Sequence, residues 1–161
     1  MTSISTERIT GRSLVNPAPF GRLTARIVKD ENLEQALAER VMDQALAFLG
    51  ACALNPKSGL SPSPLVDVGW HTFILDTVDY HEFCKVTAGR FLHHVPTGDA
   101  DGSAKGASIA TTVAVIQASG YAIDAELWNM AADCSEGSGG DGSDTSGNGN
   151  CSQCHRGCHN S

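Results

Sequence analysis

The chain has 161 residues, a formal net charge of −7, and 41% hydrophobic residues. A pI near 5.2 without a lysine and arginine stripe argues against nucleic-acid binding, because phosphate backbones repel an acidic surface. The N-terminus lacks the apolar run of a signal peptide, and no stretch reaches the roughly 18 apolar residues of a membrane span. We therefore expect a cytoplasmic protein that binds neither nucleic acid nor a membrane.

The distribution of small polar residues divides the chain into three parts. Residues 1–29 are rich in glycine, asparagine and proline, which favours an irregular N-terminal arm. Residues 30–133 carry the apolar residues of a folded helical domain. Residues 134–161 contain too few apolar side chains to offset their ordering entropy, so they are predicted to be a disordered Gly/Ser/Cys-rich tail. The predicted fold is all-α, a small bundle of four to five helices.

Apolar residues recur at helical spacing within the middle part of the chain. Asn32 is predicted to be the N-cap of the first helix. Ser63 followed by Pro64 predicts the start of a second helix. The serine side chain can accept hydrogen bonds from the free backbone N–H groups of the first turn, and proline already has the helical φ. Gly89 is predicted to end the third helix. The five helices are expected at about residues 33–54, 63–75, 77–89, 109–120 and 124–130.

Asp67 and His71 are four residues apart in the second predicted helix and therefore share one face. The carboxylate can accept an N–H from the imidazole and leave the other ring nitrogen free to bind a metal. His93 and His94 follow on a separate segment, and one of them would reach His71 if the chain folds back. A possible second metal site, suited to zinc or iron, therefore comprises Asp67, His71, His93 and His94.

The alternative for the same residues is structural. The helical period places Asp67, His71 and Ile74 on one largely apolar side, which predicts a buried His71 held by Asp67. In that case His93 and His94 simply fix a turn. A metal-dependent enzyme using Asp67, His71 and His94 is a further possibility, but the spacing places no nucleophile or second acid beside them. No catalytic residue is therefore assigned.

A resemblance to a known family lies in the same block. Its residues are Val66-Asp67-Val68-Gly69-Trp70-His71-Thr72, Tyr80, Phe83-Cys84, Gly89-Arg90 and His94. Over about residues 30–96 the chain resembles the glycine-rich domain-containing protein-like family, whose molecular function is not established. The resemblance implies a helical domain. Family members often have a second histidine two residues after the Trp-His pair, where this chain has Phe73, so a ligand at that position would be lost.

The tail contains three thiols and two imidazoles within nine residues, namely Cys151, Cys154, His155, Cys158 and His159. Two cysteines separated by two residues can bind one tetrahedral ion, and Cys158 or a histidine can complete the ligand shell. Thiolates are soft ligands, so the cluster predicts zinc or copper(I). A redox role for the vicinal cysteines is one alternative, and a chance accumulation of cysteines in a low-complexity segment is another. Attachment of a c-type haem would need an oxidising compartment, which the N-terminus does not support.

The leading functional hypothesis is a non-catalytic metal-binding protein, with the helical domain as scaffold and the tail as the ligand-bearing arm. Its expected partners are a metal ion and a protein that docks on the domain. The alternative is a precursor of a ribosomally synthesised, post-translationally modified peptide, because a folded leader followed by a tail rich in glycine, serine, threonine and cysteine resembles such precursors. A modifying enzyme would then act on Cys134, Ser138, Thr145, Cys151, Cys154 and Cys158.

Overall fold

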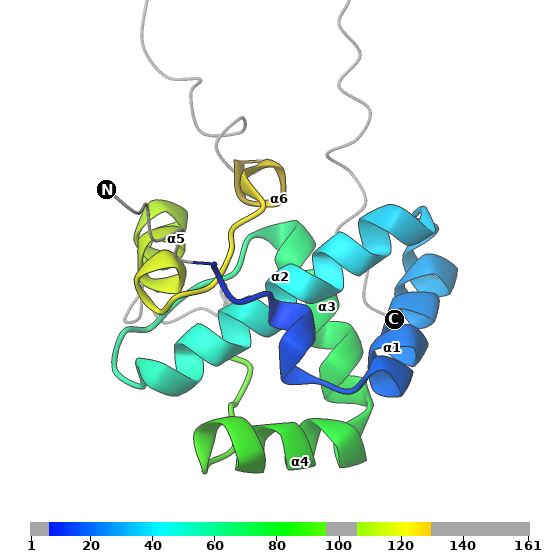
Figure 1. Cartoon of the computed structure of the whole chain (residues 1–161), viewed down its shortest axis with the longest axis horizontal. Coiled ribbons are helices and arrows are strands. Elements are labelled where there is room, and N and C mark those ends of the chain that lie inside the picture. The colour runs from blue at the N-terminus through cyan, green and yellow to red at the C-terminus, as the bar shows by residue number, and fades with distance from the viewer. Residues whose placement is uncertain (1–6, 96–105, 130–161) are drawn as a thin grey trace, which may run out of the picture.

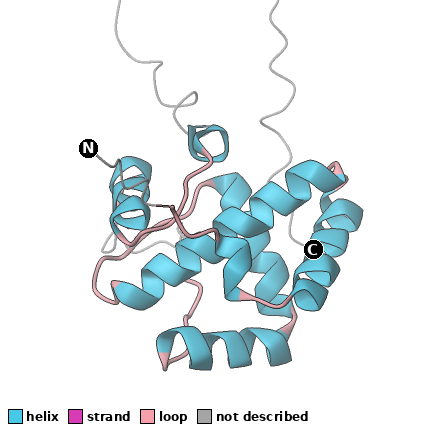
Figure 2. Ribbon diagram, in the orientation of Figure 1, coloured by secondary structure: helices cyan, strands magenta, loops and turns pink. Residues whose placement is uncertain are grey.

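The computed structural model describes residues 7–95 and 106–129, and these residues form a helical domain (Figure 1; Figure 2). One 3-10 helix and six α-helices are present in this part of the chain. Their bounds are η1 Gly11–Leu14, α1 Pro17–Glu31, α2 Gln35–Leu54, α3 Pro64–Leu75, α4 Thr77–Ala88, α5 Ile109–Ala118 and α6 Ala125–Asn129. The predicted all-α fold is confirmed.

Helix α2 crosses the middle of the molecule (Figure 1). Every residue from 44 to 51 is buried, so this part of the helix is covered on all its faces. A helix that is apolar all round needs neighbours all round, and η1, α1, α3, α4 and α5 all contact α2. The core is therefore built around α2, and α3 lies directly against it.

Specific residues determine where α3 begins and where α4 ends. The Ser63 Oγ accepts the backbone N–H of Val66 at 3.3 Å, at the start of α3. The same hydroxyl donates to the Leu127 carbonyl at 2.8 Å and ties α3 to α6. Gly89 ends α4 with a left-handed φ of 65°, which glycine adopts without strain. The helix start predicted at Ser63 and the end predicted at Gly89 are confirmed.

The irregular arm predicted over residues 1–29 is wrong from Pro17 onward, because α1 begins there. Proline is well suited to the first helical position, where its missing N–H has no partner to lose. The helix buries Phe20, Leu23 and Ile27, which lie on one face and pack into the core. This additional helix explains why the structure has six α-helices in the described residues rather than four to five.

Asn32 ends α1 instead of starting the next helix. Its φ of 53° is left-handed, a conformation that asparagine tolerates better than most residues. Helix α2 begins after Glu34. None of the described helices is long and apolar enough to span a bilayer. The predicted disordered tail over 134–161, with its cysteine and histidine cluster, lies outside the described residues.

Candidate functional site

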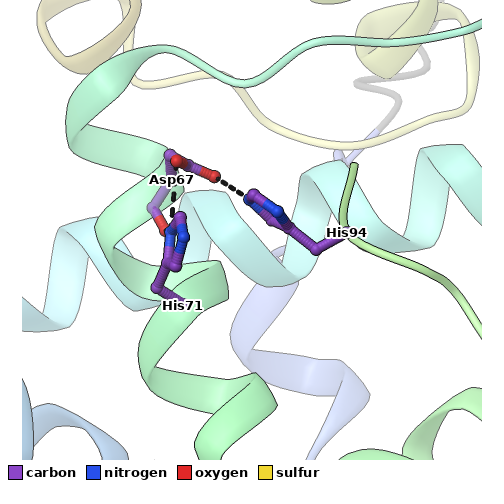
Figure 3. Close-up of side chains that lie close together, drawn as sticks. All are labelled: Asp67, His71 and His94. Atoms are coloured by element: carbon purple, nitrogen blue, oxygen red, sulfur yellow. Dashed lines mark hydrogen bonds and ion pairs between the residues drawn. The ribbon is translucent and has the colours of Figure 1, made fainter. Parts of the chain in front are cut away.

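Three polar side chains from two separate segments meet beside the first turns of α3 (Figure 3). Asp67 and His71 lie on successive turns of α3, and His94 lies on the irregular segment that follows α4. The Nδ1 of His71 is 3.0 Å from the backbone carbonyl oxygen of Asp67 and 3.1 Å from one of its carboxylate oxygens. The Nε2 of His94 is 2.8 Å from the other carboxylate oxygen. The carboxylate of Asp67 therefore bridges two imidazoles.

The cluster is open to solvent on the side of His71. The exposed fraction of the side chain is 58% for His71, 29% for Asp67 and 14% for His94. The prediction that His71 is buried is therefore wrong, although its pairing with Asp67 is present. Helix α3 turns a different face to the core, and the residues that it buries include Val66, Trp70 and Phe73.

His94 reaches Asp67 because residues 91–94 alternate between the core and the surface. Leu92 is buried and His94 is half-buried, whereas Phe91 and His93 are exposed. With this alternation only one of the two adjacent histidines faces the cluster. His93 packs its ring against Phe91, with 4.8 Å between the ring centroids. Three of the four residues of the predicted second site are thus brought together, and His93 is not among them.

The imidazole of His94 is held between two other rings. Its centroid is 4.4 Å from the indole of Trp70 and 4.3 Å from the imidazole of His71. Trp70 in turn donates its Nε1 hydrogen to the hydroxyl of Tyr80 at 2.9 Å. These contacts connect the exposed cluster to the buried interior of the domain.

Tyr80 also holds the segment that carries His94. Its hydroxyl donates to the backbone carbonyl of Leu92 at 2.5 Å. Burial raises the pKa of Tyr80, so the hydroxyl keeps its proton and remains a donor throughout the neutral range. The sequence singled out Tyr80 only as part of the family resemblance and gave it no structural role, although a tyrosine in a helical core needs a hydrogen-bond partner for its hydroxyl.

The hydrogen bonds of the cluster and a metal ion would compete for the same nitrogen atoms. The contacts of His71 and His94 with Asp67 are hydrogen bonds when the nitrogens that face Asp67 carry the hydrogens, because carbonyl and carboxylate oxygens accept. A metal ion would take the place of these hydrogens, and the ring protons would move to the other nitrogens.

The distances are compatible with such an exchange. Metal–ligand bonds of about 2.0–2.2 Å place the ligand atoms of a tetrahedral site roughly 3.3–3.6 Å apart. The contact of 2.8 Å between His94 and Asp67 would therefore have to widen by about 0.5–0.8 Å. One ligand atom from each of the three residues already lies within 4.8 Å of the other two. Within residues 7–95 and 106–129, no other group of three or more His, Cys, Asp or Glu side chains is this close.

The two cysteines of the folded domain do not belong to the cluster. Cys84 is buried and Cys52 is half-buried, and both are free thiols. Burial raises the pKa of Cys52 to about 12, so this thiol stays protonated at neutral pH and is a poor nucleophile and metal ligand. The tail ligands that the sequence suggested, Cys151, Cys154, His155, Cys158 and His159, lie outside the described residues.

A family model described as UCP032817-like matches residues 16–108, which is more than half of the chain and includes Asp67, His71 and His94. The chain therefore belongs to this family. No curated protein and no solved structure matches the chain. The match does not test the resemblance to the glycine-rich domain-containing protein-like family, which stays a prediction. Since the family's description names no activity, the function has to be argued from the site.

Proposed function

We propose that this member of the UCP032817-like family is a metal-binding protein whose folded domain holds one divalent transition-metal ion through Asp67, His71 and His94. The supporting observation is the convergence of two imidazoles and one carboxylate on a single point. Asp67 and His94 are 27 residues apart in the sequence, yet their polar atoms lie 2.8 Å apart. Two histidines and a carboxylate form a common ligand set for zinc and for iron(II).

The type of ligand favours zinc or iron(II) over copper(I) at this site. Copper(I) prefers soft sulfur ligands, whereas the cluster offers only nitrogen and oxygen. Three protein ligands leave a fourth tetrahedral position free, and the exposed side of His71 gives water access to it. The site is therefore an open one, in contrast to the closed four-ligand sites that stabilise small zinc domains.

The geometry supports binding better than catalysis. Among the described residues, the side chains of Asp67, His71 and His94 make their hydrogen bonds and ion pairs with one another and with the Asp67 backbone. A hydrolytic or redox enzyme needs a further acid, base or substrate-binding group in contact with the reacting atoms. A metal-dependent enzyme remains the second candidate, and the free fourth position on the metal is the feature that favours it.

The tail cluster is a separate proposal for zinc or copper(I), and the experiment must distinguish it from the folded site. We define the tail-serine chain as the full-length protein with four replacements, Cys134→Ser, Cys151→Ser, Cys154→Ser and Cys158→Ser. After equilibrium dialysis against Zn²⁺, this chain is expected to retain about one zinc ion through the folded site. Any additional zinc in the unmodified chain would belong to the tail.

The folded site is tested by replacing its histidines in the tail-serine chain. His71→Gln combined with His94→Gln should abolish zinc retention, because a single carboxylate binds zinc weakly. The matched control combines His81→Gln with His93→Gln, since both of these histidines are exposed and neither contacts Asp67. Equal zinc content in the two double variants would refute the proposal.

A further inference from the structure

We infer that Tyr80 is a positioning residue for the metal site, since its hydroxyl fixes the segment that carries His94. The inference rests on the proposed function and adds to it a residue that is not itself a ligand. Tyr80 lies on α4, whereas the three candidate ligands lie on α3 and on the segment after α4. Its side chain is 1% exposed, so solvent does not compete for the hydroxyl.

The hydroxyl of Tyr80 links the two parts of the site through the core. It accepts the Nε1 hydrogen of Trp70, the residue directly before His71, at 2.9 Å. It donates to the carbonyl of Leu92, two residues before His94, at 2.5 Å. The two segments of the site are thus connected twice, once by the buried hydroxyl of Tyr80 and once by the more exposed carboxylate of Asp67.

The segment that carries His94 needs such a link because it has little backbone support. Residues 90–95 form no backbone-to-backbone hydrogen bond with another described residue. Their hydrogen bonds come from side chains: Arg90 donates to the Cys52 carbonyl at 3.0 Å, Tyr80 donates to Leu92, and His94 pairs with Asp67. Metal binding would replace the last of these, which leaves Tyr80 as the nearest support that is independent of the ligands.

Removal of the Tyr80 hydroxyl should therefore weaken metal binding without removing a ligand. A less constrained His94 loses more conformational freedom when it binds a metal, and part of the binding free energy offsets that loss. Loss of a group that hydrogen-bonds directly to a metal ligand typically lowers metal affinity about 10- to 100-fold. Tyr80 acts on His94 only through the backbone that follows Leu92, so its effect should lie at the lower end of that range. We expect Tyr80→Phe to weaken Zn²⁺ binding about tenfold.

The experiment compares Tyr80→Phe with Tyr121→Phe in the tail-serine chain. Tyr121 is a second buried tyrosine, 6% exposed, and its hydroxyl lies beside Gly50 rather than beside the site. Two quantities are measured: the dissociation constant for Zn²⁺ by titration calorimetry, and the proton NMR shifts of the His94 ring before zinc is added. The His94 signals are assigned with a His94→Gln variant, and they report the position of the ring relative to the indole of Trp70.

Tyr80→Phe is expected to move the His94 signals and to weaken zinc binding, whereas Tyr121→Phe should do neither. Unchanged His94 signals in Tyr80→Phe would overturn the inference, as would moved signals with an unchanged zinc affinity. If the parent chain binds no zinc but Tyr80→Phe moves the His94 signals, the proposed metal function fails while the positioning of His94 by Tyr80 stands.

A second variant tests the same link from the surface and does not disturb the core. His93 is exposed and lies between the supported Leu92 and His94, so His93→Gly loosens the connection through the backbone freedom of glycine. His93→Ala is its control, because alanine removes the same imidazole without that freedom. Weaker zinc binding in His93→Gly than in His93→Ala is expected, and equal affinities would contradict the inference.

Discussion

The indole ring of Trp70 and the imidazole ring of His94 lie 4.4 Å apart between their centroids, with an angle of 58° between the ring planes. Trp70 is 7% exposed and packs against Phe48 of α2, at a centroid distance of 5.2 Å. A core fluorophore is therefore in direct contact with a candidate metal ligand. An ion that binds His94 would lie only a few ångströms from the indole.

This contact predicts that Co²⁺, a paramagnetic quencher, reduces the fluorescence of Trp70. Trp128 is the other tryptophan of the chain, and its indole donates to Gln44 at 2.8 Å. Trp128→Phe in the tail-serine chain isolates the Trp70 signal, which should be strongly quenched at one equivalent of Co²⁺. Addition of His94→Gln should remove the effect. Quenching of the same size with and without His94 would place the ion elsewhere.

Gly69 allows α3 to approach α2 closely directly beside the site. A Cβ at this position would lie 2.6 Å from the Ala45 Cβ and 3.1 Å from the Val41 carbonyl oxygen. Gly69→Ala should therefore force the helices apart and lower the free energy of unfolding by about 1–3 kcal/mol. Gly21→Ala is the control, since nothing lies within 4 Å of its added methyl group, and it should stabilise α1 by about 0.5–1 kcal/mol. Urea unfolding measures both, and equal stabilities would contradict the close packing.

Three buried or half-buried side chains that can lose a proton stay protonated in the folded protein. We therefore expect the fold to lose stability at alkaline pH. Burial raises the pKa of Cys52 to about 12 and also raises the pKa values of Tyr80 and Tyr121. Above about pH 9 the unfolded chain releases protons that the folded chain retains, so the free energy of unfolding falls as the pH rises. This contribution is fully present below the unfolded pKa values and is lost as the pH rises toward the folded ones.

Urea unfolding at about pH 8 and about pH 10.5 measures this loss. Cys52→Ala removes one of the three groups and should make the dependence less steep. A slope that is the same in Cys52→Ala and in the unmodified chain would show that Cys52 does not contribute.

The sequence predicted two helix ends from local chemistry, whereas Asn32 ends α1 instead of starting the next helix. The start of α3 at Ser63 and Pro64 and the end of α4 at Gly89 depend only on neighbouring backbone groups, so these residue types predict the ends directly. Helix α1 was missed because a high density of proline and glycine also suggests turns. Pro17 occupies the first helical turn and Gly21 faces solvent, so neither breaks the helix.

The candidate site was only partly predictable, because its geometry depends on long-range contacts. Helical spacing places Asp67 beside His71, but it does not tell which face of α3 turns to the core. In the structure Trp70 and Phe73 face the core, and His71 is exposed. The choice between His93 and His94 depends on the burial of Leu92, and the role of Tyr80 depends on a bond to a carbonyl twelve residues away. No local pattern carries that information.

Arg40 of α2 forms an ion pair with Asp124, the residue before α6. The guanidinium makes two contacts with the carboxylate, Nε to Oδ2 at 2.6 Å and Nη2 to Oδ1 at 2.9 Å. The hydrogen bond from Arg40 lowers the pKa of Asp124 below its usual value of 3.8. This stabilisation is therefore present above about pH 4 and is lost as the pH falls through the lower folded pKa.

Arg40→Lys should weaken that pH dependence, because an ammonium group cannot reproduce the two parallel contacts of a guanidinium. Arg26→Lys is the control, since Arg26 pairs with Asp30 at 3.5 Å on the surface of α1. Helix α6 carries Trp128, so acid titration followed by Trp128 fluorescence in a Trp70→Phe background reports whether α6 stays attached. Protonation of Asp124 should release α6 at a higher pH in Arg40→Lys than in Arg26→Lys. Identical titration midpoints would mean that packing of Leu127 and Trp128, which are 1% and 2% exposed, holds α6 without help from the ion pair.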